Sequence, residues 1–314
     1  MDLFLQFVLL VIGFVLLIKG ADWFVEGASK IADKFGIPQL VIGLTIVAMG
    51  TSAPEAAVSI SAAVKGNAGI TIGNVVGSNI MNILLILGIT SVITAISVQR
   101  STIKYEIPFL ILISVLLPVL GYLGGTVDRI DGAIFWILFI VYLLYLLRMA
   151  KKGQAVLEET PEGQKGDSIV KLLLMVVIGG IMIVLGSNVT VDAATQIAQI
   201  FGMSDRLIGL TIVAFGTSLP ELITSATAGI KGKADIAVGN IVGSNVFNIL
   251  FVTGTTALIT PVVFAENFVI DCIVAIAAVV LLLIFVARKG KLKRVGGIVM
   301  LAVYFVYFGY LLTV

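Results

Sequence analysis

The sequence predicts an all-α polytopic membrane protein, with ten transmembrane helices in two inverted five-helix repeats. Three observations support this fold class: an apolar composition, ten long hydrophobic segments and an internal duplication. Of the 314 residues, 59% are hydrophobic and 12% are charged, and the mean hydropathy is +1.16. Because ordinary soluble domains carry roughly 25% charged residues, this composition excludes a soluble or disordered chain. The apolar runs are continuous rather than alternating, which favours helices over a β-barrel.

Each of the ten segments can supply the roughly 20 apolar residues that cross a bilayer. The first segment starts without a basic region, so we expect an uncleaved span rather than a signal peptide. The segments lie near 3–27, 38–64, 68–97, 103–124, 131–149, 169–194, 206–229, 235–262, 267–287 and 295–314. We expect three parts along the chain: a first repeat at 1–150, a linker at 151–168 and a second repeat at 169–314.

Basic residues predict how the spans are oriented. With ten spans, 16 of the 20 Lys and Arg residues fall on one side of the membrane and three on the other, and Lys19 lies within a span. The positive-inside rule makes the basic side cytoplasmic. We therefore expect a multi-pass cell-membrane protein with both termini outside and the 151–168 linker in the cytoplasm.

Several function classes lack their characteristic residues. The chain has no histidine and a single cysteine, Cys272, which excludes a disulfide and a multi-cysteine metal site. It contains no GxxxxGK[ST] phosphate loop, no GxGD aspartyl motif and no GxSG serine motif. A net charge of +2 gives no nucleic-acid footprint. We expect a protein that is not an enzyme, needs no cofactor and binds no nucleic acid.

The duplication is the strongest signal. Val41–Asn82 and Leu207–Asn248 align without a gap and are identical at 25 of 42 positions. Five spans is an odd number, so the second repeat enters the membrane from the opposite side, as in many secondary transporters. A duplication kept for packing alone is the alternative, but the similarity is highest at polar residues.

One acidic residue lies in the middle of a span in each repeat. Glu55 follows Pro54 in the motif GTSAPE, and Glu221 follows Pro220 in GTSLPE. Each proline breaks the helical hydrogen bonding and turns carbonyl oxygens into the bundle. A buried acid needs a partner, and a hard cation such as Ca²⁺ or Na⁺ is the simplest one; a protonated structural glutamate is the alternative. The residues that share the helical face of the glutamates are Ala48, Thr51, Ser52, Ala214, Thr217 and Ser218.

A second motif, GNxxGSNxxN, also occurs once in each repeat, at Gly73–Asn82 and Gly239–Asn248. Its glycines permit close helix contact. Its polar residues step by four and form one helical stripe. We expect cation ligation by Ser78, Asn82, Ser244 and Asn248.

Other polar and aromatic residues are expected to act at the membrane interface. The acids near span ends should be interfacial or capping residues; they are Asp22, Glu26, Asp128, Asp131, Asp192, Asp205, Glu266 and Asp271. The aromatic residues of the fifth and tenth segments should face lipid or the interface; they are Trp136, Tyr142, Tyr145, Tyr304, Tyr307 and Tyr310.

The paired GTSxPE and GNxxGSNxxN segments resemble the α-repeats of the cation/Ca²⁺ exchanger superfamily, most closely prokaryotic Na⁺/Ca²⁺ exchangers. The resemblance covers the whole chain. It implies that Glu55 and Glu221 are the central Ca²⁺ ligands, helped by Thr51 and Thr217. The further ligands that it implies are Ser52 and Ser78 for Na⁺ toward the outside, Ser218 and Ser244 for Na⁺ toward the inside, the carbonyls of Ala48 and Ala214, and Asn82 and Asn248 in the middle.

Two departures limit the resemblance. Many relatives carry Asp at the position of Asn248, so a proton or K⁺ role there is in doubt. The long regulatory loop of animal relatives is missing.

The family also implies that the first and sixth spans slide against a central core, and Gly20 and Gly186 are candidate bending points.

Two ionised glutamates give a site charge of −2, which one Ca²⁺ or two Na⁺ would neutralise. We therefore predict a monomeric secondary antiporter that exchanges Na⁺ for Ca²⁺ by alternating access, electrogenic if a third Na⁺ binds as the family suggests. A Ca²⁺/H⁺ antiporter using the same glutamates is the alternative. A cation channel is a weaker alternative, because channels are ordinarily built as oligomers around an axial pore.

Overall fold

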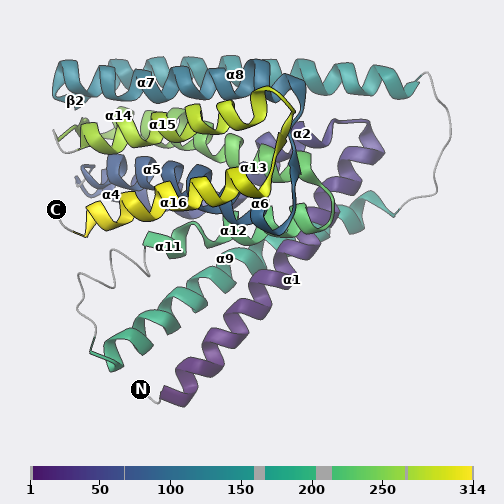
Figure 1. Ribbon diagram of the computed structural model, residues 1–314, viewed down its shortest axis with the longest axis horizontal. Helices are drawn as coiled ribbons and strands as arrows, with labels where there is room; N and C mark the ends of the chain where they lie inside the picture. Colours follow the sequence, from purple (N-terminus) through teal and green to yellow (C-terminus); the bar gives the residue numbers. More distant parts are fainter. Residues whose placement is uncertain (1–2, 67, 159–166, 203–213, 266–267, 313–314) are drawn as a thin grey trace.

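The computed structural model describes residues 3–312 except 67, 159–166, 203–213 and 266–267, and for 153–158 and 214 it describes the backbone only. It is a helical bundle with two short β-ribbons (Figure 1). The elements of the first half are α1 (Leu3–Phe35), α2 (Gln39–Ile42), η1 (Gly43–Val47), α3 (Ala48–Thr51), α4 (Ala53–Val64), α5 (Ile70–Ile80), η2 (Met81–Ile86), α6 (Leu87–Ile93), β1 (Ile96–Ser97), η3 (Thr102–Glu106), α7 (Ile107–Gly124), β2 (Thr126–Val127) and α8 (Arg129–Glu158). Those of the second half are α9 (Ile169–Ile200), α11 (Ala214–Thr217), α12 (Leu219–Ile230), α13 (Ala234–Phe247), η5 (Asn248–Thr253), α14 (Gly254–Ile259), β3 (Val262–Val263), α15 (Phe268–Ala287), β4 (Lys291–Leu292) and α16 (Arg294–Leu311).

Within the described residues, eight helices are long and apolar enough to cross a membrane. A ninth candidate is the bent pair Gln39–Thr51 and Ala53–Val64, whose halves meet at 50°. The segment predicted at 206–229 begins among residues outside the described part of the chain. A multi-pass helical membrane protein is therefore confirmed, whereas the count of ten stays a prediction.

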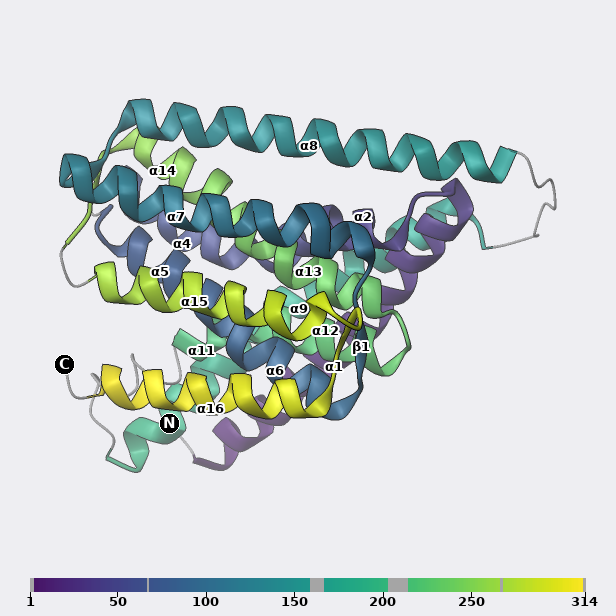
Figure 2. The ribbon, with the colours of Figure 1, turned by 45° about the horizontal axis from the view of Figure 1, so that its top comes forward.

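Burial separates central helices from peripheral ones. In the most apolar 18-residue stretch of Ala234–Ile259, 94% of the residues are buried, and in that of Ile70–Ile93, 78% are buried. Both segments nevertheless carry the polar GNxxGSNxxN motif. The corresponding stretches of α1, α7, α8, α9, α15 and α16 are only 22–33% buried. The polar motif thus lies in the protein interior, and the outer helices expose apolar side chains as lipid-facing helices do. Figure 2 shows α7 and α8 as an outer layer.

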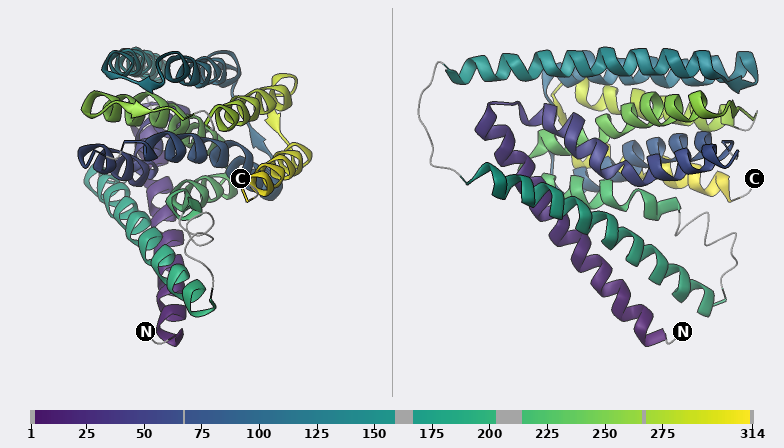
Figure 3. Two further views of the ribbon diagram at one scale, coloured as in Figure 1. Left: turned by 90° about the vertical axis from the view of Figure 1, so that its left-hand side faces the viewer. Right: turned by 180° about the vertical axis from the view of Figure 1, so that it is seen from behind.

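The two longest helices, α1 and α9, lie side by side and lean away from the bundle toward the N-terminus (Figures 1 and 3). Small residues allow their backbones to touch. A Cβ on Gly20 would lie 2.8 Å from the carbonyl oxygen of Gly179, and one on Gly13 would lie 3.0 Å from that of Gly186. Both helices run without a break through Gly20 and Gly186. The structure therefore shows these glycines as sites of close helix contact, and their role as bending points stays a prediction.

Each β-ribbon joins one strand from each half of the chain. β1 pairs antiparallel with β4, with Ile96 opposite Leu292, and β2 pairs antiparallel with β3, with Val127 opposite Val262. The β1–β4 ribbon lies at the end of the bundle toward which α8 runs, which we call the linker end. The other ribbon lies at the opposite end.

Two expectations about the fifth and tenth segments need correction. Helix α8 continues past 149 to Glu158, so the start of the expected linker is helical. Tyr142 and Tyr307 are buried rather than lipid-facing. Both are on helix faces that pack inward, and Tyr307 donates a hydrogen bond of 2.8 Å to Asp271. One capping expectation is confirmed: Asp128 accepts hydrogen bonds from the first amides of α8, those of Ile130 and Asp131.

Candidate cation site

The site is built at a helix break in each half of the chain. Between α3 and α4 the backbone leaves helical geometry at Ser52, where φ is −85° and ψ is 8°. The corresponding break between α11 and α12 is at Ser218, with φ −91° and ψ 3°. Because Pro220 has no N–H, the carbonyl of Gly216 is free of helical bonding. It accepts a hydrogen bond of 2.8 Å from Ser187 of α9 instead, so the predicted release of carbonyls is observed in the second half.

The two glutamates are buried at these breaks and lie in one polar cluster. Glu55 is 1% exposed and Glu221 is 0% exposed. Ser52, in the first half, donates a hydrogen bond of 2.7 Å to Oε1 of Glu221, in the second half. Ser78 donates one of 3.4 Å to Oε1 of Glu55. The two halves therefore contribute to a single site, and neither glutamate forms an ion pair with Lys or Arg in the described part of the chain.

Five buried oxygens of the predicted ligands have no hydrogen-bond partner among the described residues. They are Oε2 of Glu55, Oε2 of Glu221, Oδ1 of Asn82, Oδ1 of Asn248 and Oγ of Ser218. An unsatisfied buried oxygen costs free energy, about 1–3 kcal/mol for a neutral group. Hard cations satisfy such oxygens, and Ca²⁺ takes 6–8 of them. The donor set of carboxylate, amide and hydroxyl oxygens therefore fits a hard cation.

Two asparagines outside the predicted ligand set hold the broken helices in place. Asn74 donates to the carbonyl of Glu55 at 3.1 Å and to Ser59 at 2.8 Å. Asn240 donates to the carbonyl of Glu221 at 3.5 Å and to Ser225 at 2.9 Å. Asn74 and Asn240 occupy the same position in the two copies of the GNxxGSNxxN motif, and this recurrence is the sequence feature that points to them.

The central helices are joined by a crossed set of four asparagines. Asn82 donates to Oδ1 of Asn245 at 2.8 Å, and Asn248 donates to Oδ1 of Asn79 at 3.2 Å. Asn79 and Asn245 also donate to each other's backbone carbonyls. These bonds use the amide nitrogens of Asn82 and Asn248. Their amide oxygens have no partner among the described residues.

The remaining predicted ligands are placed as follows. Thr51 donates to Oδ1 of Asn240 at 3.0 Å. The carbonyl of Ala48 accepts hydrogen bonds from Thr51 at 3.3 Å and from Ser244 at 3.4 Å. These contacts connect Ala48 and Ser244 across the two halves. Thr217 ends α11, and the side chain of Ala214 lies outside the described part of the chain.

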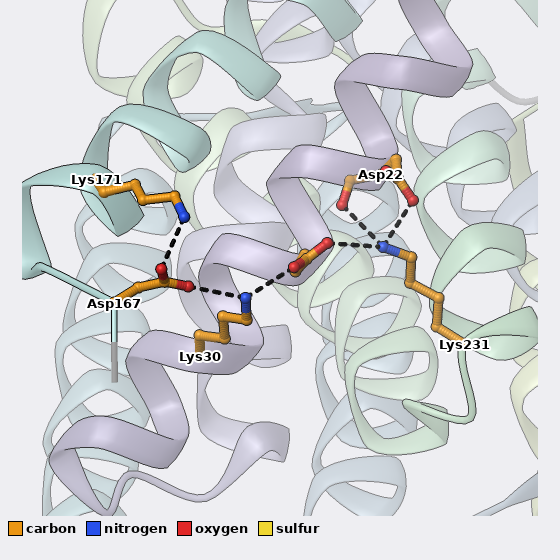
Figure 4. A network of polar contacts seen from close by, with 6 residues as sticks. Asp22, Lys30, Asp167, Lys171 and Lys231 are labelled. Carbon is orange, nitrogen blue, oxygen red and sulfur yellow. Dashed lines mark hydrogen bonds and ion pairs between the residues drawn. The ribbon is translucent and has the colours of Figure 1, made fainter. Parts of the chain in front are cut away.

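A separate ion-pair network connects α1 to its neighbours at the linker end (Figure 4). Lys231, which follows α12, lies 2.6 Å from Oδ1 of Asp22 and 3.5 Å from Oε2 of Glu26. Its Nζ also donates to the backbone carbonyl of Asp22 at 3.2 Å. Lys65, the residue of the first half that aligns with Lys231, is exposed and forms no ion pair within the described residues. Within the described part of the chain, the first half thus has no equivalent of the Lys231 ion pairs.

The same network continues to α9. Lys30 lies 2.8 Å from Glu26 and 2.9 Å from Asp167, and Lys171 lies 2.7 Å from the other oxygen of Asp167. Lys171 and then Lys30 lower the pKa of Asp167 to about 2, because both donate hydrogen bonds to its charged form. Asp167 stays ionised at physiological pH and ties the start of α9 to α1.

Comparisons with known proteins give the same assignment over most of the chain. The family model described as "sodium/calcium exchanger protein" matches twice, at residues 5–148 and 171–313. The putative antiporter CaxA of Alkalimonas amylolytica is 42% identical over 304 residues, covering 92% of both chains. The sodium/calcium exchanger MaX1 of Methanosarcina acetivorans is 32% identical over 340 residues, covering 95% of this chain and 96% of the relative. A structure of the sodium-calcium exchanger NCX_Mj superposes with a TM-score of 0.86 at 35% identity, covering 99% of this chain and 100% of that one. This chain belongs to the sodium/calcium exchanger protein family, whose members are membrane transporters rather than enzymes.

Proposed function

We propose that this protein exchanges Na⁺ for Ca²⁺ across the cell membrane, with both ions using the cluster around Glu55 and Glu221. The observation that carries the proposal is the set of five unpartnered buried oxygens, drawn from both halves of the chain. No basic side chain in the described residues offsets the two carboxylates. A cation held between the breaks would satisfy the orphaned oxygens and neutralise the glutamates together.

Charge balance explains why the two ions would exclude each other. Two ionised carboxylates carry −2, which one Ca²⁺ or two Na⁺ offsets. A third Na⁺ would leave net charge on the loaded protein, so the proposed exchange is electrogenic. Ser52 and Ser218, at equivalent breaks, are the proposed Na⁺ ligands toward opposite sides. Ser78 is proposed to act with Ser52, and Ser244 with Ser218, and the carbonyls of Ala48 and Ala214 contribute to these Na⁺ sites. Glu55 and Glu221, helped by Thr51 and Thr217, are the proposed Ca²⁺ ligands, and the glutamates also serve the Na⁺ sites. Asn82 and Asn248 are proposed to line the middle of the site.

We propose alternating access in which α1 and α9 move together against the central helices. Their long mutual contact through glycines and their divergence from the bundle support movement as a pair. The proposed topology has ten spans in two inverted repeats, 1–150 and 169–314, with both termini outside and the 151–168 linker in the cytoplasm. In this topology the Lys231 network lies on the cytoplasmic side, where it would hold that side closed. A monomer suffices, since one chain supplies the whole cluster.

A flux assay in proteoliposomes tests the proposal, with Na⁺ and H⁺ gradients imposed separately. We expect Ca²⁺ uptake driven by an outward Na⁺ gradient and accelerated by a membrane potential of the appropriate sign. Uptake that follows only the pH gradient would show a Ca²⁺/H⁺ antiporter, and single-channel currents would show a channel; either result refutes the proposal.

The carboxylates are tested by Glu55→Gln and Glu221→Gln, each of which should abolish Na⁺-driven Ca²⁺ uptake. The matched control is Asp33→Asn, which removes an exposed carboxylate outside the cluster and should leave uptake unchanged. Equal uptake by wild type and either glutamine variant would overturn the ligand assignment.

A further inference from the structure

A pocket whose surface is mostly apolar lies on the outer layer of the bundle, and none of the predicted cation ligands lines it. Its volume is about 300 Å³, and it is lined by residues of η3, α7 and α8. Figure 2 shows that α7 begins at the linker end. The polar lining residues are Lys104, Tyr105, Glu106, Tyr142 and Tyr145. None of them belongs to the proposed transport cluster, so the exchange function leaves this pocket unexplained.

Two buried groups of the pocket lack partners among the described residues. Glu106 is 1% exposed, and Tyr145 donates a hydrogen bond to its Oε1, but its Oε2 is unpartnered. Tyr142 is 4% exposed, and its hydroxyl is also unpartnered. A carboxylate oxygen at this depth normally has a donor. A ligand that completes this pair would bring hydrogen-bond donors and, beside an ionised carboxylate, positive charge.

The second half of the chain shows what a completed version of this cluster looks like. With a shift of 165 residues, Glu106 aligns with Asp271 and Tyr142 with Tyr307. There Tyr307 donates to Asp271 at 2.8 Å, so acid and phenol satisfy each other. In the first half the acid is one carbon longer and is bonded through Tyr145, which leaves Tyr142 without its equivalent bond. The open pair is therefore a feature of the first half alone and is not required by the fold.

The rest of the lining favours an organic ammonium group. The ring of Tyr142 stacks on Phe109 with centroids 5.5 Å apart, and the ring of Tyr105 lies 6.4 Å from that of Tyr145. Aromatic faces attract ammonium groups, and more strongly when water is excluded. Lys104 lies at the same pocket, with its Nζ 5.3 Å from the centre of the Tyr105 ring. It supplies a positive charge for a phosphate.

We propose that this pocket binds the headgroup of an aminophospholipid such as phosphatidylethanolamine. The primary ammonium donates to Oε2 of Glu106 and to the hydroxyl of Tyr142, and the phosphate pairs with Lys104. A membrane lipid, rather than a soluble amine, is the occupant because the lining includes an exposed apolar side chain, Val141, which is 54% exposed. Helix α7 also carries exposed apolar side chains such as Leu112, which is 60% exposed. These faces accommodate acyl chains while the headgroup sits at the linker end.

The headgroup chemistry makes the proposal selective. A choline headgroup carries the same charge but no N–H donors, so it cannot satisfy Glu106 or Tyr142. A glycerol headgroup has no positive charge to place beside the carboxylate. The experiment is native mass spectrometry of the purified full-length protein from micelles that contain equal amounts of phosphatidylethanolamine, phosphatidylcholine and phosphatidylglycerol. We expect phosphatidylethanolamine adducts to exceed either of the others by about tenfold, as hydrogen bonds to charged groups allow.

Two variants and one control complete the test. Glu106→Gln removes the charge and should reduce retention of phosphatidylethanolamine to within about twofold of phosphatidylcholine. Tyr142→Phe removes one bond and should reduce it several-fold; it also serves if Glu106→Gln does not fold. Tyr307→Phe breaks the equivalent pair in the second half and should keep the preference. Equal retention of the three lipids by wild type, preference for phosphatidylglycerol, or a preference that survives both Glu106→Gln and Tyr142→Phe would overturn the proposal.

Discussion

The ion pair between Lys231 and Asp22 makes the sharpest prediction about conformational balance. Lys231→Gln removes the charge that connects the end of α12 to α1. The pair is close, at 2.6 Å, but its side chains are 28% and 39% exposed. Water therefore screens much of the attraction, and such pairs contribute about 1 kcal/mol or less. A loss of about 1 kcal/mol corresponds to roughly fivefold more frequent opening at the linker end.

Hydrogen–deuterium exchange followed by mass spectrometry measures this opening directly. In Lys231→Gln, amides of α1 near Asp22 and of α12 near Ile230 should exchange up to about fivefold faster than in wild type. The matched control is Lys65→Gln, which removes the aligned lysine that has no ion pair and should not change exchange. Choline chloride at about 1 M shortens the screening length to roughly 3 Å and should reduce the difference between wild type and Lys231→Gln. Equal exchange in wild type and Lys231→Gln, or the same increase in Lys65→Gln, would refute the role of the network.

Three further predictions concern packing, the cation site and pH. Gly20→Ala should lower both thermal stability and transport, because its Cβ would lie 2.8 Å from the backbone of α9. Gly309→Ala is the control and should change neither, because its Cβ would have nothing within 4 Å. Equal melting temperatures for the two variants would contradict the role of the Gly20 contact. Asn240→Ala leaves buried groups unpaired and should lower the free energy of unfolding by about 1–3 kcal/mol. We expect a lower melting temperature and a smaller rise of that temperature on addition of Ca²⁺. An unchanged melting curve would refute the structural role of Asn240. Lys171 and a second lysine lower the pKa of Asp167 to about 2. The stability that Asp167 contributes is therefore complete above its unfolded pKa of about 3.9 and is lost as pH falls toward 2. Asp167→Asn should change hydrogen–deuterium exchange at the linker end by the same factor at pH 6 and pH 8, and different factors would contradict the assignment.

The mid-membrane part of the site was predictable because polar residues in an apolar chain are conspicuous. Glu55, Glu221 and their prolines identify two broken helices from sequence alone, and the breaks at Ser52 and Ser218 are where the motifs lie. The pattern cannot say which oxygens are already used. Only the structure shows that the amide nitrogen of Asn82 donates to Asn245 while its amide oxygen has no partner among the described residues.

The periphery was less predictable, for a physical reason. On an apolar helix, a tyrosine that faces lipid and one that faces another helix have the same neighbours in sequence. The sequence therefore predicts a lipid-facing or interfacial position for Tyr142 and Tyr307, although both are buried. The contacts of Asn74 and Asn240 depend on pairing between helices, which spacing within one helix does not reveal.

The two β-ribbons have a consequence for how the molecule can be divided. Every ribbon takes one strand from each half, at opposite ends of the bundle. Either half expressed alone would have two strands without their partners. It would also have only one of the two mid-membrane glutamates, Glu55 or Glu221. A chain cut within 159–166 keeps both ribbons and both carboxylates available for reassembly. Separate genes for the two halves should therefore complement each other when co-expressed, while neither half should be functional alone.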